Sequence, residues 1–285
     1  TEFNISGEKF RNAHMTWDEL EQIAEDFERK RNEHQNTVKQ YAEVLQKCLA
    51  VHSLSYRVKD TKHLIEKIIR KNPKYLETGN ALSLENYERE MTDLMGIRLL
   101  LLFKEDWLEV HDYLMKMYDN VLFEEPFAYV REGDNTHLYE NKIKIRKEKP
   151  YRSVHYVIRA DKGLAIEIQV RTLYEEAWSE IDHKLRYPYN LTNEMLANYI
   201  NIMNRLTGMG DEMGTFINSY IKNFQESLYA GVTDDNEVYH FILHEIEKCD
   251  NVEVKQAIVD KIKQADNYRE VKKIADLLKN ILQYT

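Results

Sequence analysis

Apolar residues recur at three- and four-residue intervals along the first part of the chain, which is the period of an amphipathic helix. The pattern predicts a helix over residues 17–50, behind a Thr-x-x-Glu capping box and with a break left open in the polar stretch 28–37. A second helix is predicted over residues 61–71, and Pro73 lies just beyond its end.

After residue 90 the apolar residues gather in short bursts bounded by polar turns, which indicates strands. A helix over residues 106–118 interrupts them, and the segment 161–163 fits a tight hairpin turn. The strands are predicted over residues 96–103, 121–130, 153–159 and 164–170. Helices interleaved with a few strands predict an α+β domain, with a mixed or antiparallel sheet flanked by helices.

From residue 193 onward only helical spacing remains. We predict one long helix over residues 195–228, or a pair broken at Gly208-Met-Gly210, followed by three short amphipathic helices. The domain is thus expected to carry an all-helical C-terminal extension. The expected divisions are a tag or disordered N-terminus (1–15), the domain with its N-terminal helices (16–192), the long helical extension (193–232) and a small helical module (233–285).

The composition is that of an ordinary globular protein. A hydrophobic content of 43% supports a buried core, and 4 Pro and 9 Gly argue against long flexible linkers. The net charge of -9 creates no global basic field for nucleic acid, whereas a local basic patch still acts within a Debye length. Cys48 and Cys249 have no metal-ligand spacing, and no apolar run approaches the ~18 residues of a membrane span. We expect a cytoplasmic protein with reduced thiols and no membrane partner.

Basic residues surround the start of the second predicted helix. Arg57 and Lys59 precede it, and Lys67 lies eight residues after Lys59, near the same helical face. Cations around a helix N-terminus are able to hold a triphosphate. The ordinary explanation of basic residues on an exposed helix is a solvated surface, so this pattern alone leaves both possibilities open.

Charged residues also mark two of the predicted strands. Asp93 and Arg98 flank the entrance of the first strand, either as a turn salt bridge or as a metal-binding carboxylate with a stacking arginine. In the last strand Glu167, Gln169 and Arg171 share one face because side chains alternate. That face suits a polar cleft, and it equally suits an amphipathic strand facing water.

A lysine-rich segment precedes the strand 153–159. Six basic residues fall between Lys142 and Arg152, and Tyr151 lies among them, with His155 just beyond. The segment fits an edge strand whose lysines prevent aggregation. It also fits a substrate loop in which the tyrosine stacks on a base and the cations hold phosphates.

Taken in order, these motifs resemble the synthetase domain of the RelA/SpoT family. The resemblance covers roughly residues 40–190 and is specific because five motifs follow the family's order and approximate spacing. The segment 178–187 resembles the small stand-alone members. The matching positions are Arg57, Lys59, Lys67, Asp93, Gly96, Arg98, Lys147, Tyr151, Ser153, His155, Glu167, Gln169, Arg171 and Thr172.

The resemblance implies a nucleotidyltransferase-like fold that moves the β,γ-pyrophosphate of ATP to the 3′-hydroxyl of GDP or GTP and releases AMP. For the ATP site, it implies that Arg57 and Arg98 sandwich the adenine and that Lys59 and Lys67 bind phosphates. It implies that the catalytic residues are Asp93 and Glu167. Both carboxylates would hold Mg²⁺, and the glutamate would also activate the attacking hydroxyl.

On the acceptor side, the resemblance implies that Tyr151 stacks on the base. The other expected acceptor-binding residues are Lys147, His155, Gln169 and Arg171. Pro150 replaces the usual glycine before the tyrosine, and Glu176 stands where small synthetases often have asparagine, which puts the preferred base in doubt. His111-Asp112 stands alone, so we predict none of the hydrolase activity of the long family members.

Two alternatives remain open on the sequence. The first is a toxic family member that pyrophosphorylates the 3′ end of tRNA, or adenine nucleotides. The second is an inactive nucleotide-sensing module, against which the presence of both carboxylates argues. The C-terminal helices are expected to serve a homo-oligomer or an antitoxin or regulatory partner, or simply to pack on the sheet of their own subunit.

Overall fold

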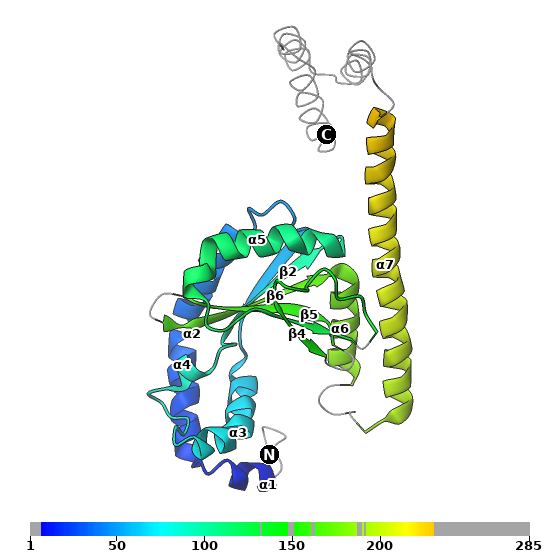
Figure 1. The fold of residues 1–285 in the computed structure, drawn as a ribbon. Coiled ribbons are helices and arrows are strands. Elements are labelled where there is room, and N and C mark those ends of the chain that lie inside the picture. Colours follow the sequence, from blue (N-terminus) through cyan, green and yellow to red (C-terminus); the bar gives the residue numbers. More distant parts are fainter. Residues whose placement is uncertain are drawn as a thin grey trace, which may run out of the picture. The chain divides into compact units, whose positions relative to one another are not determined.

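The computed structural model describes residues 7–131, 133–147, 151–160, 163–186, 190 and 192–230. A six-stranded mixed sheet in the order β1-β2-β6-β5-β3-β4 forms its centre (Figure 1). The strands are β1 (Ser53–Val58), β2 (Met95–Leu101), β3 (Phe127–Val130), β4 (Lys144–Lys147), β5 (Ser153–Arg159) and β6 (Ala165–Thr172). The pairs β2–β6 and β3–β4 are parallel, and the other neighbours are antiparallel. The predicted α+β class with a mixed sheet is confirmed.

The helices flank this sheet (Figure 1). They are α1 (Gly7–Asn12), α2 (Trp17–Leu45), α3 (Thr61–Glu77), α4 (Tyr87–Glu90), α5 (Trp107–Tyr118), α6 (Leu173–Leu185) and α7 (Glu194–Ala230). Helix α5 covers one face of the sheet through Trp107, Val110 and Leu114, which join the main core. Helix α6 contacts β6 and β2. Among the helices of the described residues, none combines the length and the apolar character that crossing a bilayer requires.

Helix α2 joins two hydrophobic cores. It begins at the capping box of Thr16 and Glu19 and continues without a break through residues 28–37. Its second half contributes Val38, Ala42 and Leu45 to the core of the sheet. Its first half contributes Leu20, Ile23 and Phe27 to a second core with α3. The long helix therefore fixes α3 relative to the sheet, and with it the turn between β1 and α3.

Three elements differ from the prediction. The strand predicted over residues 121–130 is confined to β3, Phe127–Val130, behind a 3-10 turn over Asp119–Val121. Helix α3 runs through Pro73 to Glu77, because tertiary contacts outweigh one lost backbone hydrogen bond. The buried Asn72 supplies such contacts, donating to Ala13 O and accepting from Leu82 N. Strand β1 was not predicted, and it places Arg57 in the sheet rather than at the start of a helix.

The N-terminal stretch is folded where it is described. Residues Gly7–Asn12 form α1, and Ala13 and Met15 are buried in the second core. Residues 7–15 are thus ordered, whereas residues 1–6 of the expected tag or disordered N-terminus (1–15) lie outside the described residues. The ordering follows from the apolar side chains, which cover the end of α3.

The chain divides into two compact units, residues 1–215 and 216–285. The division lies inside α7. Gly208 and Gly210 do not break this helix, because their missing side chains permit close packing. A Cβ on Gly208 would lie 2.9 Å from Arg152 Nη1, and one on Gly210 would lie 2.7 Å from the ring of Tyr174. The helical module predicted over 233–285 lies outside the described residues.

Candidate active site

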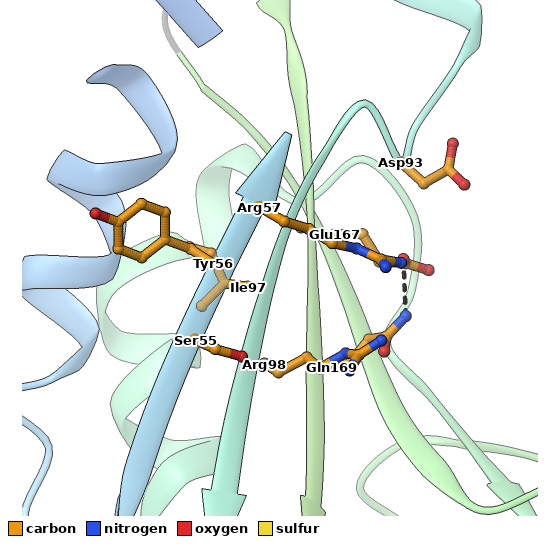
Figure 2. Close-up of a pocket in the computed structure, with 9 residues that line it drawn as sticks. Ser55, Tyr56, Arg57, Asp93, Ile97, Arg98, Glu167 and Gln169 are labelled. Carbon is orange, nitrogen blue, oxygen red and sulfur yellow. Dashed lines mark hydrogen bonds between the residues drawn. The ribbon is translucent and has the colours of Figure 1, made fainter. Parts of the chain in front are cut away.

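A polar cavity lies on the face of the sheet opposite α5, where β1, β2 and β6 run side by side (Figure 2). The cavity is lined by Ser55, Tyr56, Arg57, Asp93, Gly96, Ile97, Arg98, Glu167 and Gln169. Strand register explains the grouping, since Arg57, Gly96 and Glu167 form one row across the three strands. Five residues predicted for the site thus come together from three distant segments.

The second row of the site consists of Ser55, Arg98 and Gln169. Figure 2 shows the side chains of Arg98, Gln169 and Glu167 extending to the same side of the sheet. Gly96 has no side chain to fill the space between Arg57 and Glu167 in the first row. That space is roomy, because even an added Cβ would lie 3.9 Å from Arg57 Cγ. The space between the arginine and the glutamate is therefore accessible to a ligand.

Asp93 lies in the loop before β2 and is held by two lysines. Lys59 Nζ donates to Asp93 Oδ2 at 2.9 Å, and Lys67 forms an ion pair with the same oxygen. Burial alone would raise the pKa of Asp93, but the two ammonium groups outweigh it and lower the pKa to about 2. Burial lowers the pKa of Lys67, although the carboxylate attracts its charge. The three predicted residues form one charged cluster.

The start of α3 differs from a free helix N-terminus. Asp60 caps it, and its carboxylate accepts a hydrogen bond from His63 N. Lys59 precedes this cap in the turn after β1, and Lys67 projects from α3 toward Asp93. The cations, more than the helix end, supply positive potential at this position.

Glu167 is oriented by two neighbours on the sheet. His155 Nδ1 lies 3.0 Å from Glu167 Oε1, and Gln169 Nε2 donates to Oε2 at 2.9 Å. Burial raises the pKa of Glu167, but the hydrogen bond and charge of His155 outweigh it, so the pKa lies below its ordinary value. The carboxylate is therefore ionised near neutral pH and fixed in direction.

Two other predicted acceptor residues lie next to His155 and Gln169. Tyr151 Oη lies 3.3 Å from His155 Nε2 and is also bound by Arg171 Nη2. Arg171 Nη2 in turn donates to Gln169 Oε1 at 2.9 Å. Burial raises the pKa of Tyr151, which keeps its hydroxyl protonated. Tyr151, His155, Gln169 and Arg171 thus form a ring of contacts that closes through Glu167.

Lys147 is not part of this ring. It ends the edge strand β4, its side chain is exposed, and none of the described contacts of the ring involves it. The lysine-rich segment thus forms an edge strand over Lys144–Lys147. Pro150 lies outside the described residues.

Glu176 and Glu180 of α6 belong to the site; the resemblance linked Glu176 to the acceptor base, whereas no motif pointed to Glu180. Glu176 Oε1 accepts from Arg98 Nη1 at 2.7 Å, and its Oε2 accepts from Arg171 Nη1 at 2.7 Å. Glu180, one helical turn further, also binds Arg98. Their spacing of four residues behind the Thr172 cap is the signal that would have placed both on one helix face.

Asp93 and Glu167 are the carboxylates available for a metal ion. Asp93 Oδ1 is buried and has no hydrogen-bond partner in the described part of the chain. Oxygen ligands of this kind suit Mg²⁺, which often binds through one or two carboxylates and substrate phosphates. The described residues hold no cluster of three or more His, Cys, Asp or Glu side chains able to bind a metal by themselves. The residues present fit a metal that arrives with a phosphorylated ligand.

His111 belongs to the core. Its Nδ1 lies 2.9 Å from Tyr156 Oη, and its ring stacks on Trp107 with centroids 4.9 Å apart. Burial lowers its pKa, which favours the neutral imidazole. This histidine therefore serves packing, and Cys48 is likewise a buried free thiol.

Comparison with known proteins finds similar sequences. Residues 56–192 match the region found in RelA / SpoT proteins. GTP pyrophosphokinase YjbM of Bacillus subtilis is 31% identical over 123 residues, which are 40% of this chain and 52% of YjbM. GTP pyrophosphokinase YwaC of the same organism is 24% identical over 154 residues, 49% of this chain and 62% of YwaC. The chain thus spans about half to three fifths of these curated relatives.

The fold agrees as well. The crystal structure of small alarmone synthetase 1 from Bacillus subtilis superposes with a TM-score of 0.54 at 21% identity, over 70% of this chain and 98% of that one. The structure of that enzyme bound to its product pppGpp gives 0.52 at 20% identity, over 70% and 99% of the two chains. Residues 56–192 are therefore similar to the region found in RelA / SpoT proteins, as the motifs indicated. The fold of the chain is that of the small alarmone synthetases.

Proposed function

We propose that this chain is an ATP-dependent pyrophosphokinase that forms (p)ppGpp and AMP from ATP and GDP or GTP. The observation that carries the proposal is the pair of carboxylates, Asp93 and Glu167, facing one cavity between a lysine pair and a ring of acceptor residues. Support also comes from the relatives, which are named GTP pyrophosphokinases.

On the donor side, Arg57 and Arg98 lie on neighbouring strands and line the same cavity, which suits stacking on both faces of adenine. Lys59 and Lys67 would exchange their contacts with Asp93 for contacts with the ATP phosphates. Asp93 and Glu167 would hold Mg²⁺, and the bound ion would neutralise phosphate charge.

In the transfer step, Glu167 accepts the proton of the acceptor 3′-hydroxyl. The 3′-oxygen forms a bond to the β-phosphorus of ATP, the bond from that phosphorus to the α,β-bridging oxygen breaks, and AMP leaves. The contact of His155 with Oε1 directs the carboxylate and keeps it ionised for this task. Tyr151 stacks on the acceptor base, and Arg171 lines the acceptor site and holds the Tyr151 hydroxyl.

The second candidate is transfer to the 3′ end of tRNA or to an adenine nucleotide. The basic edge strand β4, with Lys144, Arg146 and Lys147, supports it, because such a strand is able to bind a nucleic-acid backbone. Glu176 does not favour either acceptor, because Arg98 and Arg171 already occupy both of its oxygens. An inactive sensor is the third candidate.

The test is an acceptor panel. The full chain is incubated with γ-labelled ATP, Mg²⁺ and, in parallel, GDP, GTP, ATP or deacylated tRNA, with Glu167→Gln as control. Label on GDP or GTP is the expected result. Label only on tRNA or ATP would favour the second candidate. Nucleotide binding without transfer to any acceptor would leave the sensor.

We also propose that α7 assembles with a second copy of the chain. Exposed apolar residues alternate at spacings of four and three along one face of the helix, which is the seam of a coiled coil. They are Met195, Tyr199, Ile202, Leu206, Met209 and Met213. Light scattering of the full chain should show a dimer or larger species. Leu206→Lys should dissociate it, whereas an unchanged mass, or a monomeric wild type, would direct attention to a regulatory partner.

A further inference from the structure

The residue after the predicted acceptor tyrosine has a role of its own. Tyr151 contacts His155 and Arg171 at the active-site face. Arg152 turns to the other side, as neighbours in an extended segment do, and the residue is 5% exposed. There it meets α7, so two consecutive residues connect the acceptor site with that helix.

The guanidinium of Arg152 is bound to α7 through Nη2, while its buried Nε has no hydrogen-bond partner in the described residues. Its Nη2 donates to both Asn204 O and Asn204 Oδ1 at 2.9 Å. Asp134 lies 3.9 Å from Nε, and Gly208 leaves room for Nη1, which a Cβ would approach to 2.9 Å. The guanidinium is buried, so the loss of a partner would leave its charge poorly compensated. These contacts therefore hold Arg152 in place.

A second contact joins α7 to the neighbouring strand. Thr172 Oγ1 lies 2.8 Å from Asp211 Oδ2, and Thr172 directly follows Arg171. Asn204, Gly208 and Asp211 follow at spacings of four and three, so they lie on one face of α7. One face of α7 therefore contacts Arg152 and Thr172, the residues that directly follow Tyr151 and Arg171. Tyr151 and Arg171 in turn bind each other.

The donor side is linked to α7 less directly in the described contacts, through α6, whose Trp178 Nε1 donates to Ile200 O at 3.0 Å. Lys59 and Lys67 both bind Asp93, and Arg98 is held by Glu176 and Glu180 of α6. A disturbance at the contact between Arg152 and α7 should reach the acceptor site first.

We infer that Arg152 is a positioning residue for the acceptor, which fixes Tyr151 by clamping its backbone to Asn204 of α7. The inference rests on the proposed function and adds to it a control of acceptor binding by a helix outside the catalytic cluster. The opposite face of that helix carries the exposed apolar residues, so binding there is able to alter the clamp.

The test compares Asn204→Ala with the full-length wild type in steady-state kinetics for both substrates. The KM for the guanosine nucleotide should rise about tenfold, whereas the KM for ATP should change less than about twofold. Asn204→Asp keeps the oxygen acceptor and should restore the acceptor KM. Arg205→Ala, an exposed neighbour on α7, is the matched control and should leave both values unchanged.

The outcomes separate the two levels of the proposal. Absence of transfer in the wild type would contradict the proposed function itself. An active wild type with an unchanged acceptor KM in Asn204→Ala would overturn the positioning role alone. Equal rises in both KM values, or no restoration by Asn204→Asp, would reduce Arg152 to a structural residue and overturn the inference as well.

Discussion

His155 Nδ1 lies 3.0 Å from Glu167 Oε1 and sets the direction of that carboxylate. The histidine comes from β5 and the glutamate from β6, and the two side chains lie on the same face of the sheet. Gln169 holds the second oxygen of the glutamate. The proton acceptor of the proposed reaction is thus fixed before any substrate binds.

Removal of His155 should therefore reduce turnover more than substrate binding. In His155→Ala we expect kcat to fall on the order of 10- to 100-fold, since the loss of an orienting partner commonly costs that much. The KM for ATP should stay within about twofold, because the described contacts of the donor residues do not include this histidine. His137→Ala, at an exposed position, is the control. Wild-type kcat in His155→Ala would contradict the assigned role.

Glu176 should couple the two substrates. Its oxygens bind Arg98 and Arg171 separately, so Glu176→Gln should raise the KM for ATP and the KM for the acceptor together, by about three- to tenfold. Glu180 binds Arg98 and is more exposed, so Glu180→Gln should affect ATP alone and more weakly. Steady-state kinetics of the two variants distinguish them. An effect of Glu176→Gln confined to one substrate would contradict the coupling.

Asp93 should be required for metal-dependent binding. Its Oδ1 is buried without a partner in the described residues, and its Oδ2 binds two lysines. Calorimetry with a non-hydrolysable ATP analogue should show tighter binding in Mg²⁺ than in EDTA for the wild type. Asp93→Asn should lose that difference and transfer together. Transfer that survives either EDTA or the substitution would contradict the metal site.

Asp211 should make stability depend on pH. Its burial first, and then the charge of Glu175, raise its pKa from 3.8 to about 7, against the opposing effects of Thr172, Arg152 and Lys104. The native state therefore binds the proton more tightly than the unfolded chain. The stability contributed by the neutral carboxyl is fully present below about pH 3.8 and is lost as pH rises through about 7.

Asp211→Asn keeps this position neutral at every pH. Relative to the wild type, its free energy of unfolding should rise between pH 4 and 7, at up to about 1.4 kcal/mol per pH unit. Urea titrations at several pH values measure this difference, with Glu212→Gln as the exposed control. A difference between variant and wild type that stays constant with pH would contradict the raised pKa.

Local patterns predicted much of the fold. The alternation of Glu167, Gln169 and Arg171 follows from the period of a strand, and the structure places Glu167 and Gln169 in the cavity and Arg171 beside it. Strand β1 escaped prediction because its side chains are mostly exposed or half-buried, which leaves no apolar alternation. The end of α3 was predicted before Pro73 because proline disfavours a helix locally. In the structure, buried contacts decide where the helix ends.

The remaining parts of the site depend on register and packing. The row of Arg57, Gly96 and Glu167 joins three segments through two strand pairings that no local spacing reveals. The bridging position of Glu176 and the clamp of Arg152 arise only once α6 and α7 pack on the sheet. Long-range contacts of this kind are fixed by the whole fold rather than by any one motif.

The central claim is that a pyrophosphoryl group moves as one unit from ATP to a guanosine nucleotide. Chromatography of a reaction containing the full chain, ATP, GTP and Mg²⁺ measures every nucleotide at once. The proposed function predicts AMP and pppGpp in equal amounts, with neither formed when GTP or Mg²⁺ is omitted. ADP as the product of ATP, or AMP formed without a pyrophosphorylated acceptor, would contradict it.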